Sequence, residues 1–509
     1  MALSVSVRTP LKGASATRMF ASLVMTAVVL AAIFFGFLAT TGSPIYIAVG
    51  VGLVGGAALF ARPDLAVWIL LIGTLLVNGL VGLTVPQYGK VAWLFSMTGF
   101  FLLAASFLKV FEAQRLRQLW IPGFVSALFV LLFYSTITAA FFSDGLAEAL
   151  VGFKRYYQLF GLVFFLSLLP LAVKSEHRIK YWLVAIFILF LLQLPFAIVQ
   201  RVFLVPLREG LWKQGVVPID IVSGTFEASL EGGGSSSIMV VFLAIGLAYV
   251  LTLLRDRMWP RKRALLAAVV IGAPLFLGET KIALVLLPLV FVLVFSRQIR
   301  RSPVTAILTL AVGAGLTLLL AWIYFSLLAT QGNTFETQLE KAFAYNFGSV
   351  GYYDRYSLNR SSAIVFWWNE HGWENISNMF FGHGVGSSYS GAGSLVPGHL
   401  SRVYPYMAIN LTTLSSLLWD VGLVGASLFG YVFLSAWKHA TRLYWQEQDG
   451  FVRARLMAIR VSIAANAFTV LYSNSLVAGM SHETILAFTL GYLAWLVRKE
   501  RFKTISQNT

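Results

Sequence analysis

Long apolar runs constrain the fold of this chain more than any other feature, and alternate gaps between them are rich in Lys and Arg. A run of roughly 17 to 25 apolar residues can cross the hydrocarbon core of a bilayer as a helix, which satisfies its own backbone hydrogen bonds. The sequence therefore predicts an all-α, polytopic integral membrane protein with about 12 to 14 transmembrane helices. The apolar runs are residues 20–41, 44–61, 65–85, 91–111, 120–142, 157–173, 181–203, 238–254, 264–278, 282–296, 304–328, 417–436, 457–476 and 484–497.

The composition agrees with a protein whose solvent is lipid. Hydrophobic residues make up 58% of the 509 residues and charged residues only 12%, and the mean hydropathy is +0.79. A soluble globular domain carries about 25% charged residues. The chain contains no cysteine, which excludes disulfides and thiolate metal sites.

The basic residues are divided unequally between the two sets of gaps. If the N-terminus is cytoplasmic, the cytoplasmic gaps hold 26 of the 38 Lys and Arg residues but only 7 of the 21 acidic residues. Cytoplasmic loops carry such an excess of Lys and Arg. We therefore expect a multi-pass membrane protein with both termini in the cytoplasm. If the host is a diderm bacterium, this is the inner membrane and the outer face is periplasmic. This topology accounts for the net charge of +17, so no nucleic-acid partner is expected.

Two long connections define the expected domain organisation, and both fall on the outer side. Residues 1–328 are predicted to form a transmembrane bundle with an outer loop at 204–237, residues 329–416 a large, partly helical periplasmic loop, and residues 417–509 the C-terminal transmembrane helices. Loops of this length in compact proteins are usually functional or disordered. Amphipathic helices are expected at 337–344 and 361–373.

Aromatic and basic residues gather on the same outer side. Trp367 and Trp368 in the large loop suit either the interfacial aromatic belt or stacking on sugar rings. A single cation near a membrane face can anchor a lipid headgroup, but several that converge can bind a pyrophosphate. The candidate cations are Arg155, Arg201, Lys281, Arg360 and Arg402.

Four segments, in this order along the chain, resemble the O-antigen ligase and polysaccharide polymerase superfamily. They are Val199-Gln200-Arg201 with the turn Gly224-Thr225-Phe226; Leu277-Gly278-Glu279-Thr280-Lys281; Arg360 and Trp367 with Phe381-Gly382-His383-Gly384-Val385-Gly386-Ser387; and Asn410 to Leu417 with Asp420-Val421-Gly422-Leu423-Val424-Gly425. Two positions depart from the family pattern. Thr280-Lys281 stands where the family usually has Ser-Arg, and Ile409 stands where ligases have a His before the Asn.

The resemblance implies an enzyme that transfers glycans from undecaprenyl pyrophosphate on the periplasmic face. We expect a polymerase that joins lipid-linked repeat units into exopolysaccharide or O-antigen. A ligase that transfers the glycan to lipid A core is one alternative. A transporter or flippase of lipid-linked oligosaccharide is the other. The expected partners are the lipid-linked glycan, an acceptor glycan or lipid A core, the bilayer and a chain-length regulator.

The chemistry of such a transfer predicts roles for individual residues. A lipid pyrophosphate leaves readily once cations screen its charge, so neither a metal nor a cofactor is expected. The acceptor hydroxyl needs a proton acceptor, which a carboxylate or imidazole can supply. The catalytic candidates are His399, Glu279 and Glu227. The candidates for the pyrophosphate are Arg155, Arg201, Lys281 and Arg360, and those for the glycan are Trp367, Trp368, His383 and Arg402. Asp420 is expected at a helix start, as a cap or as a partner of the helix dipole rather than as a catalyst.

Overall fold

The computed structural model describes residues 55–56, 58–59, 62–84, 92–112, 120–207, 221–226, 235–278, 281–329, 340, 358–390 and 396–508. The chain divides into two compact units, Met1–Leu65 and Ala66–Thr509, and most described residues belong to the second unit. Helices and turns account for these residues, with no β-strand among them. The predicted all-α fold class is therefore confirmed.

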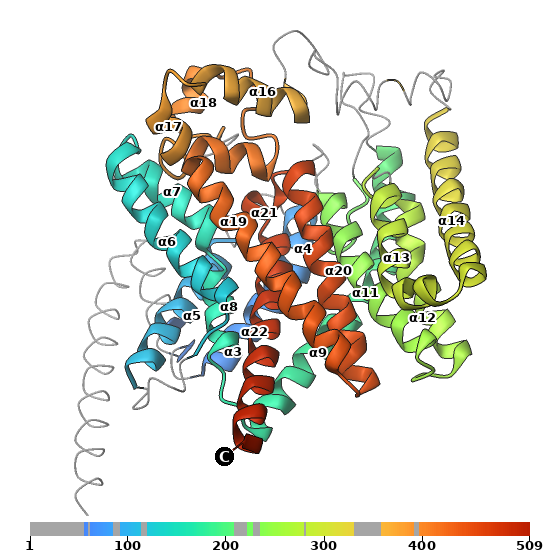
Figure 1. Ribbon diagram of the computed structural model, residues 1–509. Helices are drawn as coiled ribbons and strands as arrows, with labels where there is room; N and C mark the ends of the chain where they lie inside the picture. The colour runs from blue at the N-terminus through green and yellow to red at the C-terminus, as the bar shows by residue number, and fades with distance from the viewer. Residues whose placement is uncertain are drawn as a thin grey trace, which may run out of the picture. The chain divides into compact units, whose positions relative to one another are not determined.

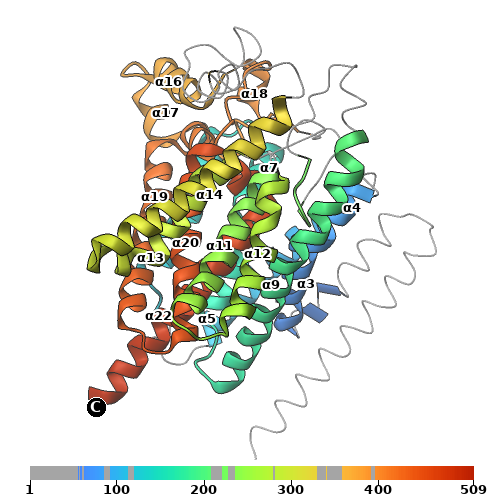
Figure 2. The ribbon, with the colours of Figure 1, turned by 90° about the vertical axis from the view of Figure 1, so that its right-hand side faces the viewer.

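Long helices of the second unit run side by side, and short helices cover one of their ends (Figures 1 and 2). The first half of the chain contains α3 (Pro63–Ile72), η1 (Gly73–Val77), α4 (Asn78–Thr84), α5 (Ala92–Glu112), α6 (Gly123–Phe142), α7 (Leu146–Tyr157), α8 (Phe160–Ser167), α9 (Val173–Val199), η4 (Gln200–Leu204) and α11 (Ser235–Arg255). The second half contains α12 (Arg261–Leu277), α13 (Ala283–Arg301), α14 (Pro303–Ala329), α16 (Arg360–His371), α17 (Ile376–Phe381), α18 (His399–Val403), α19 (Thr413–Gln446), α20 (Gly450–Tyr472), α21 (Ser475–Ala478) and α22 (Met480–Asn508).

Seven segments within the described part of the chain are long and apolar enough to cross a membrane. They are Pro63–Thr84, Gly123–Phe142, Val173–Leu207, Ser235–Arg255, Ala283–Arg300, Thr413–Gln446 and Gly450–Tyr472. Their outward faces are apolar as well. On α6, for example, Phe133, Ile137 and Phe141 follow one another at helical spacing and are 69%, 42% and 79% exposed. Large apolar side chains exposed in such stripes need lipid around them, and the chain is a polytopic membrane protein.

The predicted segments agree with the described helices at most positions but not at all of them. The helix expected at 361–373 is α16, and the loop helices α17 and α18 follow it. The runs at 20–41 and 44–61 and the helix expected at 337–344 lie outside the described residues, apart from short pieces near the end of the second run. The run at 157–173, which was predicted to be one span, is wrong as a single helix. Its residues belong to α7, α8 and the start of α9.

Gln158 explains the break between α7 and α8. Its side chain is only 4% exposed and bonds to two other helices, accepting from Ser96 Oγ at 2.6 Å and donating to Glu483 Oε1 at 2.9 Å. Its backbone carbonyl oxygen packs directly against Gly99 of α5. A Cβ added to Gly99 would lie only 1.8 Å from this oxygen. The chain can turn at this depth because neighbouring helices, rather than water, satisfy its polar groups.

α11 is the central helix of the second unit and contacts α9, α12, α13, α20 and α22. It carries no charge before Arg255, and most of its residues are buried. Small residues allow its neighbours to approach closely: a Cβ added at Gly246 would lie 2.9 Å from the Phe190 ring. A helix that is apolar on every face is expected in the middle of a bundle.

The long helices run between two ends that differ in character, here called the loop end and the basic end. The loop end carries α16, α17 and α18, and the basic end carries the C-terminal part of α22 (Figure 1). At the basic end Asp256 binds both Arg255 and Arg453, at 2.8 and 2.9 Å, and Lys499 binds Glu176 at 2.7 Å. Ion pairs between α9, α11, α20 and α22 thus collect where the sequence concentrates its Lys and Arg residues.

Gly422 kinks α19 at the loop end. Its φ of +65° and ψ of −169° are not helical, and a Cβ at this position would lie 2.4 Å from the carbonyl oxygen of Phe380. Glycine adopts positive φ without the penalty that a side chain imposes. The kink therefore lets the end of α17 pack against the backbone of α19.

Replacing Gly422 by Ala is expected to destabilise the protein, because a side chain in this region of positive φ and extended ψ costs about 1 to 3 kcal/mol before any clash is counted. Gly430→Ala in the same helix is the matched control, since nothing lies within 4 Å of a Cβ at that position. Thermal unfolding of the purified protein in detergent should give a lower Tm for Gly422→Ala than for Gly430→Ala. Equal Tm values would contradict this account of the kink.

Candidate functional site

Three of the six histidines of the chain meet at the loop end, and we call His371, His383 and His399 the histidine cluster. His371 is the last residue of α16, His383 lies in the turn after α17, and His399 is the first residue of α18. The ring centroids of His371 and His383 are 5.1 Å apart, and those of His383 and His399 are 6.1 Å apart. The buried indole of Trp419 packs against both His371 and His383.

Glu148 on α7 orients the imidazole of His399. Its Oε1 lies 2.9 Å from Nδ1 of His399, and its Oε2 accepts the backbone N–H of His399 at 2.7 Å. The ionised carboxylate can only accept hydrogen bonds, so Nδ1 carries the hydrogen and neutral His399 has a lone pair at Nε2. The His399 side chain is 24% exposed, whereas that of Glu148 is 2% exposed. An imidazole fixed in one tautomer with an accessible lone pair is suited to accept a proton.

Glu148 stays ionised in this arrangement. Burial raises the pKa of its carboxyl, but the hydrogen bonds from His399 and Asp144 and the electrostatic interaction with the His399 ring outweigh burial, and the net result is a lowered pKa. The backbone N–H of Asp144 adds a further hydrogen bond to Oε1, at 3.2 Å. The carboxylate therefore keeps the charge that holds His399 in its tautomer.

The other two histidines are neutral and bonded to each other. His371 Nδ1 donates to the carbonyl of Trp367 at 2.8 Å, so its Nε2 accepts from Nε2 of His383, also at 2.8 Å. Burial and the neighbouring imidazoles of His371 and His399 lower the pKa of His383 to about 4. Burial also lowers the pKa of His371. In this tautomer His383 has its lone pair at Nδ1.

Asp420 holds the turn that carries His383. This carboxylate is fully buried and accepts four hydrogen bonds, from Tyr156 Oη at 2.9 Å, Gly386 N at 3.1 Å, Ser387 Oγ at 2.9 Å and Ser388 N at 2.8 Å. A buried charge needs such partners, because desolvation without them is costly. Asp420 lies inside α19 rather than at its start, so the expectation of a helix cap is wrong. Asp420 instead holds the glycine-rich turn after α17 in place through its hydrogen bonds to Gly386, Ser387 and Ser388.

The glycines of this turn allow direct backbone contact with α7. Gly384 and Gly386 have φ values of +89° and +92°, which side chains rarely adopt. A Cβ on Gly152 of α7 would lie 2.3 Å from the carbonyl oxygen of Val385. Because no side chains intervene, Glu148 reaches the backbone and ring of His399 from the same helix.

Arg155 is a predicted cation on α7, the helix that also carries Glu148. It follows Glu148 and Gly152 on one face of α7 at helical spacing. Its guanidinium stacks 3.9 Å from the centroid of the Tyr389 ring, and the carbonyl of Tyr389 accepts the N–H of Gly398 at 2.9 Å. Among the described residues no carboxylate forms a salt bridge with Arg155.

The remaining predicted cations have different surroundings. Arg402 on α18 pairs with Asp144 at 2.5 Å on the exposed surface beside Glu148. Arg360 begins α16, at the other end of that helix from His371; it donates to the carbonyl of Tyr472 and stacks on the Tyr472 ring at 4.0 Å. Arg201 lies in η4, and Lys281 lies two residues before the start of α13. The structure thus places Arg155 and Arg402 around the histidine cluster, with Arg360 farther along α16.

The aromatic candidates separate into buried and exposed side chains. Trp367 is 2% exposed, lies in the core cluster with Trp419 and donates from Nε1 to the carbonyl of Leu418 at 3.1 Å. Trp368 and Trp373 are 44% and 71% exposed and pack edge to face, with ring centroids 6.1 Å apart. Trp367 therefore supports α16 from within, and the accessible aromatic surface belongs to Trp368 and Trp373.

Two of the three catalytic candidates, Glu227 and Glu279, lie outside the described residues. Within the described part of the chain, no group of three or more metal-ligating side chains has a metal-binding arrangement. Of the catalytic candidates, the described site therefore contains His399.

Sequence reasoning missed Glu148, His371 and Tyr389. Two signals pointed to them: three of the six histidines fall within residues 371–399, and Glu148, Gly152 and Arg155 occupy positions i, i+4 and i+7 of one helix. A stripe that combines an acid, a glycine and a cation beside the membrane indicates close packing together with polar chemistry.

Comparisons with models of protein families, with curated proteins and with solved structures found no match for this chain.

Because the histidine cluster is buried, we expect the free energy of unfolding to depend on pH. The folded protein keeps His383 neutral down to a pH of about 4, while a histidine in the unfolded chain takes up its proton near pH 6.5. Between these values the unfolded state binds more protons, so the free energy of unfolding falls as the pH falls, by up to about 1.4 kcal/mol for each unit of pKa difference.

His383→Gln should therefore lose less stability than the wild type between pH 7 and pH 4.5, as measured by Tm in detergent. His177→Gln, which changes an exposed histidine at the start of α9, is the matched control and should follow the wild type. A His383→Gln profile parallel to that of the wild type would contradict the buried neutral imidazole.

Proposed function

We propose that this protein is a glycan polymerase that joins repeat units linked to undecaprenyl pyrophosphate, at the outer face of a bacterial inner membrane. The observation that carries the proposal is the pairing of His399 with Glu148. It supplies the one group that a sugar transfer from an activated lipid requires, a positioned proton acceptor beside cations.

The reaction that we propose is a displacement at the anomeric carbon of the donor sugar. A hydroxyl of the acceptor glycan attacks this carbon, and the bond between the carbon and the pyrophosphate oxygen breaks. His399 Nε2 takes the hydroxyl proton, Glu148 stabilises the resulting imidazolium, and undecaprenyl pyrophosphate leaves with the bonding electrons. The hydrogen bond between Glu148 and Nδ1 of His399 supports this mechanism. Because Nδ1 donates to the carboxylate, Nε2 is the ring nitrogen that can accept the proton.

Arg155 is our first candidate to bind the leaving pyrophosphate. Its charge lies two helical turns from Glu148 on the same face of α7, about 10 Å along the helix axis. A guanidinium binds phosphate oxygens with two parallel hydrogen bonds and neutralises developing charge. We propose that Arg201, Lys281 and Arg360 complete the pyrophosphate site, and that Trp368 and Arg402 contact the glycan.

The orientation of the site relative to the membrane follows from the charge distribution. The histidine cluster is at the loop end, and the positive-inside rule assigns the opposite, basic end to the cytoplasm. This orientation favours an outward-facing site, where lipid-linked glycans are polymerised.

The polymerase is favoured over a ligase by the surroundings of Ile409. This residue stands where ligases have a His, is 1% exposed and lies in the apolar core cluster. No proton acceptor is present at that position, so His399 is the imidazole available for the transfer.

A deletion strain provides the first test of this function. Loss of the protein should cause single lipid-linked repeat units to accumulate and long polymer to disappear, as measured by a profile of lipid-linked, surface and secreted glycans. Long polymer stranded on undecaprenyl pyrophosphate, with bare lipid A core, would instead identify a ligase. Unchanged pools would overturn the enzyme assignment.

Substitutions at the pair should separate the two roles. In membranes of the deletion strain that carry each variant, His399→Ala is expected to lower the rate of polymer formation by about 10² to 10⁴, the usual contribution of a general base. Glu148→Gln should lower the rate less, with kcat reduced more than KM, because it disturbs the tautomer and not the proton acceptor itself.

His177→Ala is the matched control for these measurements and should retain full activity, because His177 is exposed at the basic end. Polymer formation at the control rate by His399→Ala, with equal amounts of protein in the membrane, would exclude His399 as the base.

A further inference from the structure

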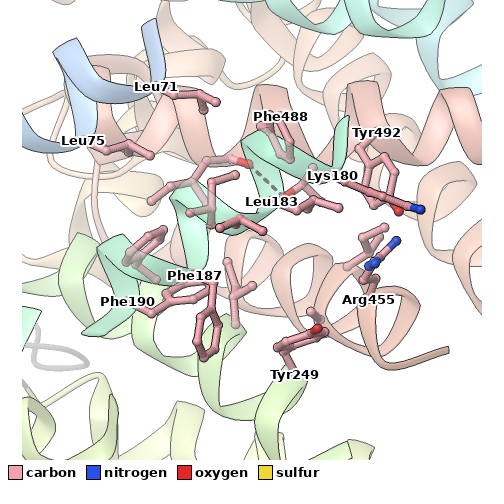
Figure 3. A pocket seen from close by; sticks show the side chains of 18 of the residues that line it. Leu71, Leu75, Lys180, Leu183, Phe187, Phe190, Tyr249, Arg455, Phe488 and Tyr492 are labelled. Carbon is pink, nitrogen blue, oxygen red and sulfur yellow. Dashed lines mark hydrogen bonds between the residues drawn. The ribbon is translucent and has the colours of Figure 1, made fainter. Parts of the chain in front are cut away.

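A second site lies at the basic end, between α9, α11, α20 and α22. Its cavity of about 460 Å³ falls within the range of roughly 300 to 1,000 Å³ typical of ligand pockets. Figure 3 shows the cavity with Leu71, Leu75 and Phe190 towards one side and Lys180, Arg455 and Tyr492 towards the other. The apolar and charged parts of the cavity are therefore segregated.

The charged side of this cavity carries cations and no acid. Lys180, Arg263 and Arg455 line it, and none of the described lining residues is Asp or Glu. Elsewhere at the basic end arginines are matched by carboxylates, as Arg255 and Arg453 are by Asp256. Asp449, which does not line the cavity, interacts electrostatically with Arg455. The lining itself still carries three cations and no carboxylate, and such a lining at the mouth of an apolar cavity favours an anionic ligand.

Aromatic side chains hold two of these cations at the boundary between charged and apolar surface. Arg263 stacks 4.4 Å from the ring centroid of Trp259, whose ring contacts Phe187 edge to face at 5.7 Å. Arg455 interacts with the hydroxyl groups of Tyr249 and Tyr492. Trp and Tyr are typical of the level where lipid headgroups meet hydrocarbon.

The lining of the cavity includes an apolar side chain that is also part of the outer apolar surface of α9. Val184 of α9 lines it and is 56% exposed, and Ile188, one turn farther along the same helix, is 50% exposed. A ligand that enters from this side meets an apolar wall first and reaches the cations with its charged group.

We propose that this cavity binds an anionic phospholipid of the leaflet at the basic end. The phosphate lies among Lys180, Arg263 and Arg455, and one acyl chain lies along α9, past Phe187 and Phe488 towards Leu75.

The site is separate from the one at the loop end. Arg455 lies near the start of α20. The last residue of the same helix is Tyr472, which stacks on Arg360. A rise of about 1.5 Å per residue puts roughly 26 Å between them. A lipid whose phosphate lies at Arg455 is therefore not a donor whose pyrophosphate lies beside His399.

Native mass spectrometry of the full-length protein tests the proposal, with phosphatidylglycerol and phosphatidylcholine of identical acyl chains as probes. Phosphatidylglycerol should bind about tenfold or more tightly, and Lys180→Gln with Arg263→Gln should remove most of this preference. Lys174→Gln with Lys262→Gln removes the same charge from exposed positions on the same two helices and should leave the preference intact. Equal binding of the two lipids, or equal loss in both double variants, would overturn the site.

Two further measurements identify the ligand. Val184→Trp should obstruct the opening and weaken phosphatidylglycerol binding, whereas Val199→Trp, exposed on the same helix outside the cavity, should not. Inorganic phosphate at millimolar concentration should fail to displace the phospholipid. Displacement by phosphate would mean a simple anion site, and preferential displacement by undecaprenyl phosphate would mean a polyprenyl site; either result would overturn the proposal.

Discussion

The buried carboxylate of Asp420 is the interaction on which the loop end depends. Its four hydrogen bonds join α19, α7 and the glycine-rich turn, which otherwise has little side-chain surface with which to pack. Once the turn is fixed, His383 is held against Trp419 and His371, and Glu148 comes within reach of His399. A charge that is costly to bury thus specifies one arrangement of three segments distant in sequence.

The polar groups of the protein are divided between its two ends. The loop end contains imidazoles kept neutral by burial and one imidazole oriented by a carboxylate, which suits proton transfer. At the basic end, ion pairs connect the helices, and the described lining of a cavity there includes three cations but no Asp or Glu. α20 connects the two ends, because Tyr472 at its last residue stacks on Arg360 and Arg455 near its start lines the cavity.

Aromatic residues serve two purposes in this arrangement. Trp367 and Trp419 form the apolar core beneath the histidines. Their apolar rings lower the local polarity, and this low polarity favours the neutral forms of His371 and His383. Trp368 and Trp373 present open ring surface at the loop end, and Trp259 supports a cation at the basic end. The same residue type therefore has a core, a surface or an interfacial role according to its burial.

The sequence by itself determined the all-α membrane architecture, because bilayer thickness sets the length of an apolar run and the backbone must bond within it. It also singled out His399 and the glycine-rich turn. It did not reveal Glu148, which is 251 residues away from His399, nor the break at Gln158 within an apolar run, nor the place of Asp420 inside α19. Hydropathy is a local property, whereas these three features depend on which helices pack together and on the partners that satisfy each buried polar group. Only the tertiary structure decides those partners.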